Sequence, residues 1–168
     1  MRKIWAPWRI EYIRGERTKE CIFCQKSKEN SDRENYILFR GANNFVILNT
    51  YPYNPGHLMV ATYRHLADLE ELSEEELFEH FDLVRRSARA LTEAYKPQGF
   101  NIGINLGRVA GAGVEDHVHT HIIPRWSGDT NFVTVVSDIR VIPEALDATY
   151  AELLGKIAGH TVRVKKSK

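Results

Sequence analysis

Apolar and polar side chains alternate along several short segments of the chain, which is the pattern of half-buried β-strands. The clearest case is residues 100–106, in which every second side chain is apolar. Shorter apolar runs predict four further strands, at residues 36–40, 45–49, 58–63 and 117–123. Residues 41–44 are the expected turn between the first two of these, and Pro124 is expected to close the last.

Two other segments are expected to be helical. Ser73, with Glu76 three residues later, forms the capping box of a helix start, and Pro97 would end that helix. The side chains expected to face the core along it are Leu77, Phe81, Val84, Ala88, Leu91 and Tyr95. A final helix is expected at residues 143–158, with Pro143 in its first turn. Because the strands come in adjacent runs around one long helix, the pattern favours an α+β domain with an antiparallel sheet.

Composition narrows the class of protein. The chain of 168 residues is long enough for one domain with a real core, and 43% hydrophobic and 27% charged residues are ordinary for a globular protein. The formal net charge of +1 argues against a dedicated nucleic-acid binder. No segment approaches the roughly 20 apolar residues of a membrane span. Charged residues interrupt residues 1–17, so no signal peptide is expected and we expect a cytoplasmic protein.

The chain divides into an arm, a domain and a tail. Residues 1–20 form an aromatic and basic arm, with Trp5 and Trp8, that would pack on the body or a partner subunit, or else line a nucleotide base. Residues 21–160 form the single domain, and residues 161–168 form a basic tail that we expect to be solvated. The candidate chemistry therefore lies in the domain.

Three of the seven histidines stand at alternate positions in one predicted strand. Since strand side chains alternate between faces, His117, His119 and His121 would form a row on one face. An apolar core seldom contains three groups that each need a hydrogen-bond partner, which disfavours a purely structural role. Either the row binds a metal through neutral imidazole nitrogens, or one histidine acts as a nucleophile that its neighbours orient. We expect His80 and His160 to be ordinary structural residues.

A glycine-containing loop, residues 105–113, leads into this row. Glycines allow backbone N–H groups to approach an anion closely and hold it. Beside the histidines, the loop therefore favours a phosphate held within reach of a nucleophile. Arg108 in the loop is expected to be solvated rather than to add its charge to the site.

Residues 117–123, His-Val-His-Thr-His-Ile-Ile, resemble the signature of the histidine-triad (HIT) family, in which two apolar residues follow three alternating histidines. Residues 55–60, Pro-Gly-His-Leu-Met-Val, resemble the family's strand that carries a Gly-His pair, and a helix lies between the two motifs as in the family. The resemblance covers about residues 21–125. It implies a five-stranded antiparallel sheet with two main helices, and a homodimer that joins two such sheets.

Three further segments resemble the branch of this family that contains diadenosine tetraphosphate phosphorylases. They are residues 5–9 in the arm, residues 49–57, and residues 124–126. The branch implies attack on the α-phosphate of a dinucleoside polyphosphate and a covalent nucleotidyl-histidine. With inorganic phosphate as the acceptor, diadenosine tetraphosphate would give ADP and ATP, and with water it would give AMP and ATP. The alternatives are a nucleoside phosphoramidate or other nucleotide hydrolase of the same family, and a non-enzymatic nucleotide-binding module.

The resemblance also implies a role for each polar residue of the site. His119 would be the nucleophile, His121 would hydrogen-bond the α-phosphate, and His57 would support the row from the neighbouring strand. Asn49 would lie near the ribose. The residues implied to contact phosphate are Asn105, Gly111 and Gly113. Many family hydrolases carry Gln-Ser where this chain has Ala112-Gly113, which weakens a simple hydrolase assignment; the loop backbone could polarise the leaving oxygen instead.

The two cysteines, Cys21 and Cys24, have the spacing of a zinc knuckle, although such a pair also fits redox chemistry or free buried thiols. The resemblance implies a closed structural zinc site that His65 and His117 complete. The gap of about 40 residues from Cys24 to His65 far exceeds zinc-finger spacing and, with the near-neutral charge, disfavours a zinc-dependent nucleic-acid binder. Magnesium is a further candidate cofactor, since divalent ions often assist polyphosphate chemistry.

Overall fold

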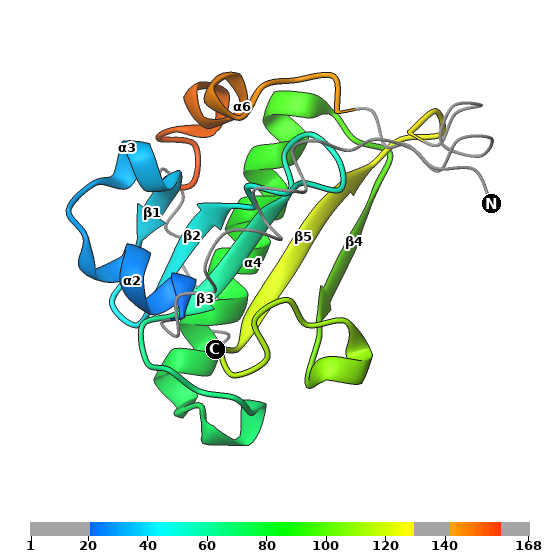
Figure 1. Cartoon of the computed structure of the whole chain (residues 1–168). Coiled ribbons are helices and arrows are strands. Elements are labelled where there is room, and N and C mark those ends of the chain that lie inside the picture. The colour runs from blue at the N-terminus through cyan, green and yellow to red at the C-terminus, as the bar shows by residue number, and fades with distance from the viewer. Residues whose placement is uncertain (1–20, 130–141, 159–168) are drawn as a thin grey trace, which may run out of the picture.

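The computed structural model describes residues 21–129 and 142–158, which form a five-stranded sheet with flanking helices (Figure 1). The predicted arm of residues 1–20, the tail of residues 161–168 and His160 lie outside the described residues. The strand order is β1-β2-β3-β5-β4, and every neighbouring pair is antiparallel. The strands are β1 (Ile37–Arg40), β2 (Asn44–Leu48), β3 (Leu58–Thr62), β4 (Gly99–Ile104) and β5 (His119–Arg125). The predicted fold class is therefore confirmed.

Helices cover the two faces of the sheet unequally (Figure 1). The long helix α4 (Glu74–Tyr95) lies along one face and contacts β2, β3 and β5. The short helix α2 (Ile22–Lys28) packs on the other face through Phe23. The remaining described helices are α3 (Asp32–Asn35), α6 (Leu146–Leu153) and the 3-10 turns η1 (Leu69–Glu71) and η2 (Arg108–Ala110). Within the described part of the chain, no helix is both long and apolar enough to cross a membrane.

Each face of the sheet has its own apolar core, because successive strand side chains point to opposite sides. On β2, Val46 and Leu48 pack toward α4, whereas Phe45 and Ile47 pack toward Phe23 of α2. All five residues of β2 are buried. The α2 face is therefore a second, smaller core rather than a solvated surface.

Helix α4 begins at the predicted capping box. The Ser73 hydroxyl accepts a hydrogen bond from the Glu76 N–H, and the Glu76 carboxylate accepts one from the Ser73 N–H. The buried face, however, differs from the predicted one: Leu77 and Phe81 are 42% and 49% exposed. The residues that are buried are Glu76, His80, Leu83, Val84, Ser87, Ala90 and Leu91. Apolar spacing could not locate this stripe, because two of its members are ionisable residues that are buried with hydrogen-bond partners.

Strand β5 runs through Pro124 to Arg125, so the prediction that this proline ends the strand is wrong. Pairing with β3 stops at Ile122, while pairing with β4 continues to Arg125. The Pro124 carbonyl oxygen accepts a hydrogen bond from Asn54 Nδ2 at 2.9 Å, on the side where β3 has already ended. The missing N–H of the proline therefore faces a side without a strand partner. The predicted final helix is also too long, since α6 covers only the middle of residues 143–158.

Candidate active site and metal centre

A row of histidines lies on the α2 face at the start of β5. His119 and His121 lie on the strand, and His117 lies two residues before it. The Phe23 ring lies 5.1 Å from the ring of His117 and 4.8 Å from the ring of His119. The rings of His119 and His121 are 4.9 Å apart. Thr120, between them, faces α4 instead, so the three histidines share one face as their spacing predicts.

The protonation of His119 is fixed by a backbone group. Its Nδ1 lies 2.7 Å from the carbonyl oxygen of His117, which can only accept, so Nδ1 carries the proton and Nε2 keeps a lone pair. Burial lowers the pKa of His119, because the charged ring would lose hydration, and the hydrogen bond to His117 only partly opposes this. A neutral imidazole with a lone pair on Nε2 can act as a nucleophile near neutral pH.

The orientation of His121 comes from His57, which directly precedes β3. The Tyr53 N–H donates to His57 Nδ1 at 3.1 Å, so the proton of His57 lies on Nε2 and is donated to His121 Nδ1 at 2.9 Å. The remaining nitrogen of His121, Nε2, is then the one that carries a proton. Burial, together with the neighbouring His119, lowers the pKa of His121 to about 4. His121 is therefore a neutral N–H donor, which suits a phosphate oxygen.

Asn49 directly follows β2 and lies beside His57. Its Oδ1 accepts a hydrogen bond from the Tyr51 N–H at 2.9 Å, and its Nδ2 lies 3.4 Å from His57 Nδ1. The structure thus brings Asn49, His57 and His121 into one connected group, with His119 adjoining it.

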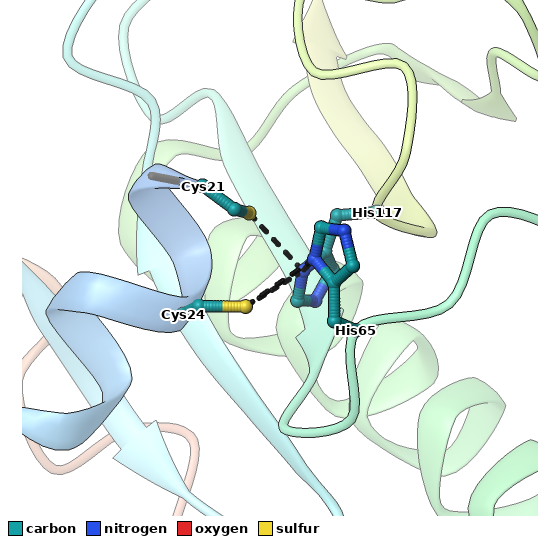
Figure 2. Close-up of side chains that lie close together, drawn as sticks. All are labelled: Cys21, Cys24, His65 and His117. Carbon is teal, nitrogen blue, oxygen red and sulfur yellow. Dashed lines mark hydrogen bonds between the residues drawn. The ribbon is translucent and has the colours of Figure 1, made fainter. Parts of the chain in front are cut away.

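His117 belongs to a second group of side chains, in which two cysteines of the α2 region point toward two histidines (Figure 2). Cys21 Sγ lies 3.2 Å from His117 Nδ1, and Cys24 Sγ lies 3.3 Å from His65 Nδ1. The four ligand atoms all lie within 4.8 Å of one another. His117 Nε2 donates to the Thr62 carbonyl at 2.8 Å, so its Nδ1 turns a lone pair toward the cluster. These residues can hold a metal ion, and two sulfurs with two imidazole nitrogens are a donor set that fits zinc.

Comparison with known proteins decides the family. The HIT domain model matches residues 31–128, more than half of the chain. The chain belongs to the HIT family.

Relatives of this HIT chain include named enzymes. The AP-4-A phosphorylase of Mycobacterium tuberculosis (strain ATCC 25618 / H37Rv) is 36% identical over 157 residues, which are 89% of this chain and 80% of that one. The adenosine 5'-monophosphoramidase hnt1 of Schizosaccharomyces pombe is 32% identical over 137 residues, 82% of this chain and 98% of that one. Among solved structures, a Zn-bound histidine triad family protein from Mycobacterium smegmatis has a TM-score of 0.65 and 29% identity, covering 83% of this chain and 94% of that one.

The glycine loop of this HIT chain joins β4 to β5. Gly107 and Gly111 flank η2 with φ angles of 75° and 87°, a backbone conformation that favours glycine. No described atom lies within 4 Å of a Cβ built on Gly107, Gly111 or Gly113, so packing does not require glycine there. The Arg108 side chain is 85% exposed, as predicted for a solvated residue. The phosphate contacts of Asn105, Gly111 and Gly113 stay predictions.

Two backbone groups that orient histidines of the HIT site could not be predicted from the identities of the side chains. Tyr53 orients His57 through its backbone N–H, and Thr62 orients His117 through its backbone carbonyl, and any residue supplies such groups. His80, predicted to be structural, is buried with both ring nitrogens hydrogen-bonded. In the sequence, a hydrogen-bond partner for His80 is indicated by Thr120, because its hydroxyl stands among apolar residues on the α4-facing side of the strand.

Proposed function

We propose that this protein is a nucleotidyl-transfer enzyme that acts on the α-phosphate of dinucleoside polyphosphates through a covalent intermediate on His119. The observation that carries the proposal is the 2.7 Å contact from His119 Nδ1 to the His117 carbonyl, which keeps the lone pair on Nε2. His121 adds a neutral N–H donor directly beside this nucleophile. The phosphorylase and phosphoramidase among the relatives support a nucleotide substrate.

The reaction runs in two displacements. In the first, the His119 Nε2 lone pair forms a bond to the α-phosphorus, while the P–O bond to the leaving polyphosphate breaks and that oxygen keeps the electron pair. In the second, an oxygen of the acceptor attacks the phosphorus, the P–N bond breaks, and the lone pair returns to Nε2. Any proton of the acceptor oxygen passes to solvent. His121 donates its N–H to a phosphoryl oxygen as charge develops there.

The remaining site residues bind the substrate in this proposal. Asn49, beside His57, contacts the ribose. The loop residues Asn105, Gly111 and Gly113 contact phosphate through the loop that leads into β5. Magnesium bound to the polyphosphate would neutralise part of its charge.

Inorganic phosphate is the acceptor that we favour, because the M. tuberculosis relative at 36% identity is named as a phosphorylase. Diadenosine tetraphosphate then gives ADP and ATP. The second candidate is hydrolysis, including hydrolysis of a nucleoside phosphoramidate, which the S. pombe relative favours. Both candidates use the same nucleophile and differ only in the acceptor or the leaving group.

Product analysis by ion-exchange chromatography tests the proposal. Diadenosine tetraphosphate is incubated with the protein and magnesium, with and without inorganic phosphate. ADP and ATP that form only with phosphate establish the phosphorylase. AMP and ATP without phosphate establish a hydrolase, and no turnover in either tube moves the assignment to the phosphoramidate hydrolase or to a binding module.

The nucleophile is tested with His119→Gly, which should lower turnover by at least about a thousandfold while the fold is retained. Arg89→Ala is the matched control, because Arg89 is an exposed α4 residue that forms an ion pair with Glu93 of the same helix. Substantial residual turnover in His119→Gly would refute the assignment.

We also propose that Cys21, Cys24, His65 and His117 hold a structural zinc ion. The donor set fits zinc, and a zinc-bound protein is among the similar structures. When bound, the ion ties α2 to the segment that leads into β5. Cysteine pairs that bind metal rather than form disulfides are more common in reducing compartments, which supports a cytoplasmic location.

A homodimer is the assembly that we propose. Strand β4 is an edge of the sheet, and edge strands are usually covered or protected. Ile102 of β4 is exposed on the α4 side, since it pairs with Ile122 of the α4 core. On α4 itself Leu77 and Phe81 are exposed, and Phe78 is 74% exposed. Apolar side chains of this size on one flank indicate a protein interface, and a second copy of the chain would continue the sheet.

A further inference from the structure

A chain of hydrogen bonds crosses the core between α4 and the sheet, from β2 to β5. His80 Nδ1 lies 2.8 Å from Asn44 Oδ1, and His80 Nε2 lies 2.7 Å from Thr120 Oγ1. None of the three residues is more than 1% exposed. Buried polar groups lose free energy when a partner is removed, so each of the three restrains the others.

The direction of the hydrogen bonds is set at the β2 end. Asn44 Nδ2 donates to the Glu79 carboxylate and to the Glu76 carbonyl oxygen, both at 3.1 Å, so Asn44 Oδ1 is left to face His80. His80 therefore carries its proton on Nδ1 and accepts the Thr120 hydroxyl proton at Nε2. The Glu79 carboxylate also accepts two backbone N–H groups of the β1–β2 turn, at 2.6 and 2.7 Å. The chain is thus anchored in that turn and ends on β5.

We propose that this chain positions the reacting histidines and that His80 is its central positioning residue. Thr120 is the residue between His119 and His121, with its side chain on the opposite face of the sheet. Holding its hydroxyl fixes the rotation of this part of β5, and with it the direction in which both neighbouring imidazoles project. In-line attack depends on that direction, since a misplacement of about 1 Å can cost about a hundredfold in rate.

The packing supports a positional role over simple core filling. The other α4-facing residue of this part of β5, Ile122, is apolar and joins the apolar core. Valine has nearly the shape of threonine and is likewise enriched in strands, so packing alone would not require a hydroxyl at position 120.

Two tests follow, one kinetic and one spectroscopic. The kinetic test of this inference rests on the proposed function, whereas the spectroscopic test does not.

The kinetic test compares Thr120→Val, which replaces the hydroxyl with a methyl group, with Thr120→Ser, which keeps the hydroxyl. We expect Thr120→Val to lower kcat about 10- to 100-fold with KM within about twofold, and Thr120→Ser to keep kcat within about threefold. A purely structural role would lower the melting temperature of Thr120→Val and leave its kcat at the wild-type value, which would overturn the proposal.

Long-range proton–nitrogen NMR of the imidazoles needs no substrate. We expect wild-type His80 as the neutral Nδ1–H tautomer, and we expect the His119 Nδ1–H signal to shift or broaden in Thr120→Val but not in Thr120→Ser. An Nε2–H tautomer of His80 in the wild type overturns the proposal even if Thr120→Val does not fold. Absence of turnover in the wild type, with the expected NMR result, contradicts the proposed function and leaves the positioning role intact.

Discussion

His57 Nε2 lies 2.9 Å from His121 Nδ1, and this contact determines that His121 offers an N–H group rather than a lone pair to the site. The Tyr53 N–H fixes the proton of His57 in turn. A backbone amide therefore sets the hydrogen-bonding character of a side chain two steps away. Loss of the His57 side chain should therefore change the tautomer of His121 while the His121 side chain stays in place.

Replacing His57 with alanine should lower kcat about a hundredfold, because the tautomer of His121 is then no longer fixed. His57→Gln is the matched variant, since its amide N–H can still donate toward His121, and we expect it to recover part of the loss. Steady-state kinetics on folded, metal-loaded protein measure both. Equal activity of His57→Ala and the wild type would show that His121 does not depend on this relay.

Stability should fall in mild acid, and His80 should account for part of the loss. Burial lowers the pKa of His80 in the folded protein to about 4, against about 6.5 in the unfolded chain. Between these values the unfolded chain binds the extra proton, so stability falls as the pH drops from about 6.5 toward 4. From pH 7 to pH 5 this one group should remove about 2 kcal/mol from the free energy of unfolding.

Urea unfolding at pH 7, 6 and 5 measures this loss. His80→Gln is the comparison, because it removes the titrating ring and keeps every metal ligand. The variant should be less stable at pH 7 but should lose less stability on acidification. If the wild type and His80→Gln lose the same free energy of unfolding between pH 7 and pH 5, His80 does not cause the loss.

Removing one metal ligand outside the histidine row should abolish metal binding. We expect the wild type to carry about one zinc per chain after purification without chelator, and His65→Ala to carry less than about 0.3, with a lower melting temperature. Elemental analysis and thermal unfolding measure the two effects, with the exposed variant Arg89→Ala as the control. A wild-type content below about 0.3 zinc per chain would contradict the zinc assignment.

An acidic residue in the exposed apolar surface of α4 should break the proposed dimer. Phe78→Asp should sediment as a monomer where the wild type sediments as a dimer, because a carboxylate is costly to bury at an interface. Leu154→Asp is the matched control, since Leu154 is another exposed apolar residue, 54% exposed, directly after α6. A monomeric wild type, or a dimeric Phe78→Asp, would exclude this interface.

The sequence predicts the histidine row well because a period of two residues fixes the face of a strand. Once β5 forms, His119 and His121 must share a side, and the structure places them so. The family resemblance supplied the metal ligands, because no local pattern joins Cys21 and Cys24 to histidines that are far away in the sequence.

Other features depend on contacts that no local pattern contains. Leu77 and Phe81 are apolar yet exposed, because the buried face of α4 includes Glu76 and His80, which find partners on other elements. Pro124 stays within β5 because β3 ends before reaching it. Tertiary hydrogen bonds determine which face of α4 is buried, and the end of a neighbouring strand allows β5 to continue through Pro124. Neither can be found from the local sequence, because both depend on segments that meet only in the folded chain.

His117 serves two sites with two different parts of itself. Its imidazole faces the cysteines, whereas its carbonyl oxygen holds the proton of His119. Side chains are exchanged by mutation, but every residue keeps a carbonyl. A lineage could therefore replace this histidine and abandon the metal while the backbone continued to prepare the nucleophile. Loss of the His117 side chain would thus remove a metal ligand and leave in place the carbonyl oxygen that fixes the His119 tautomer.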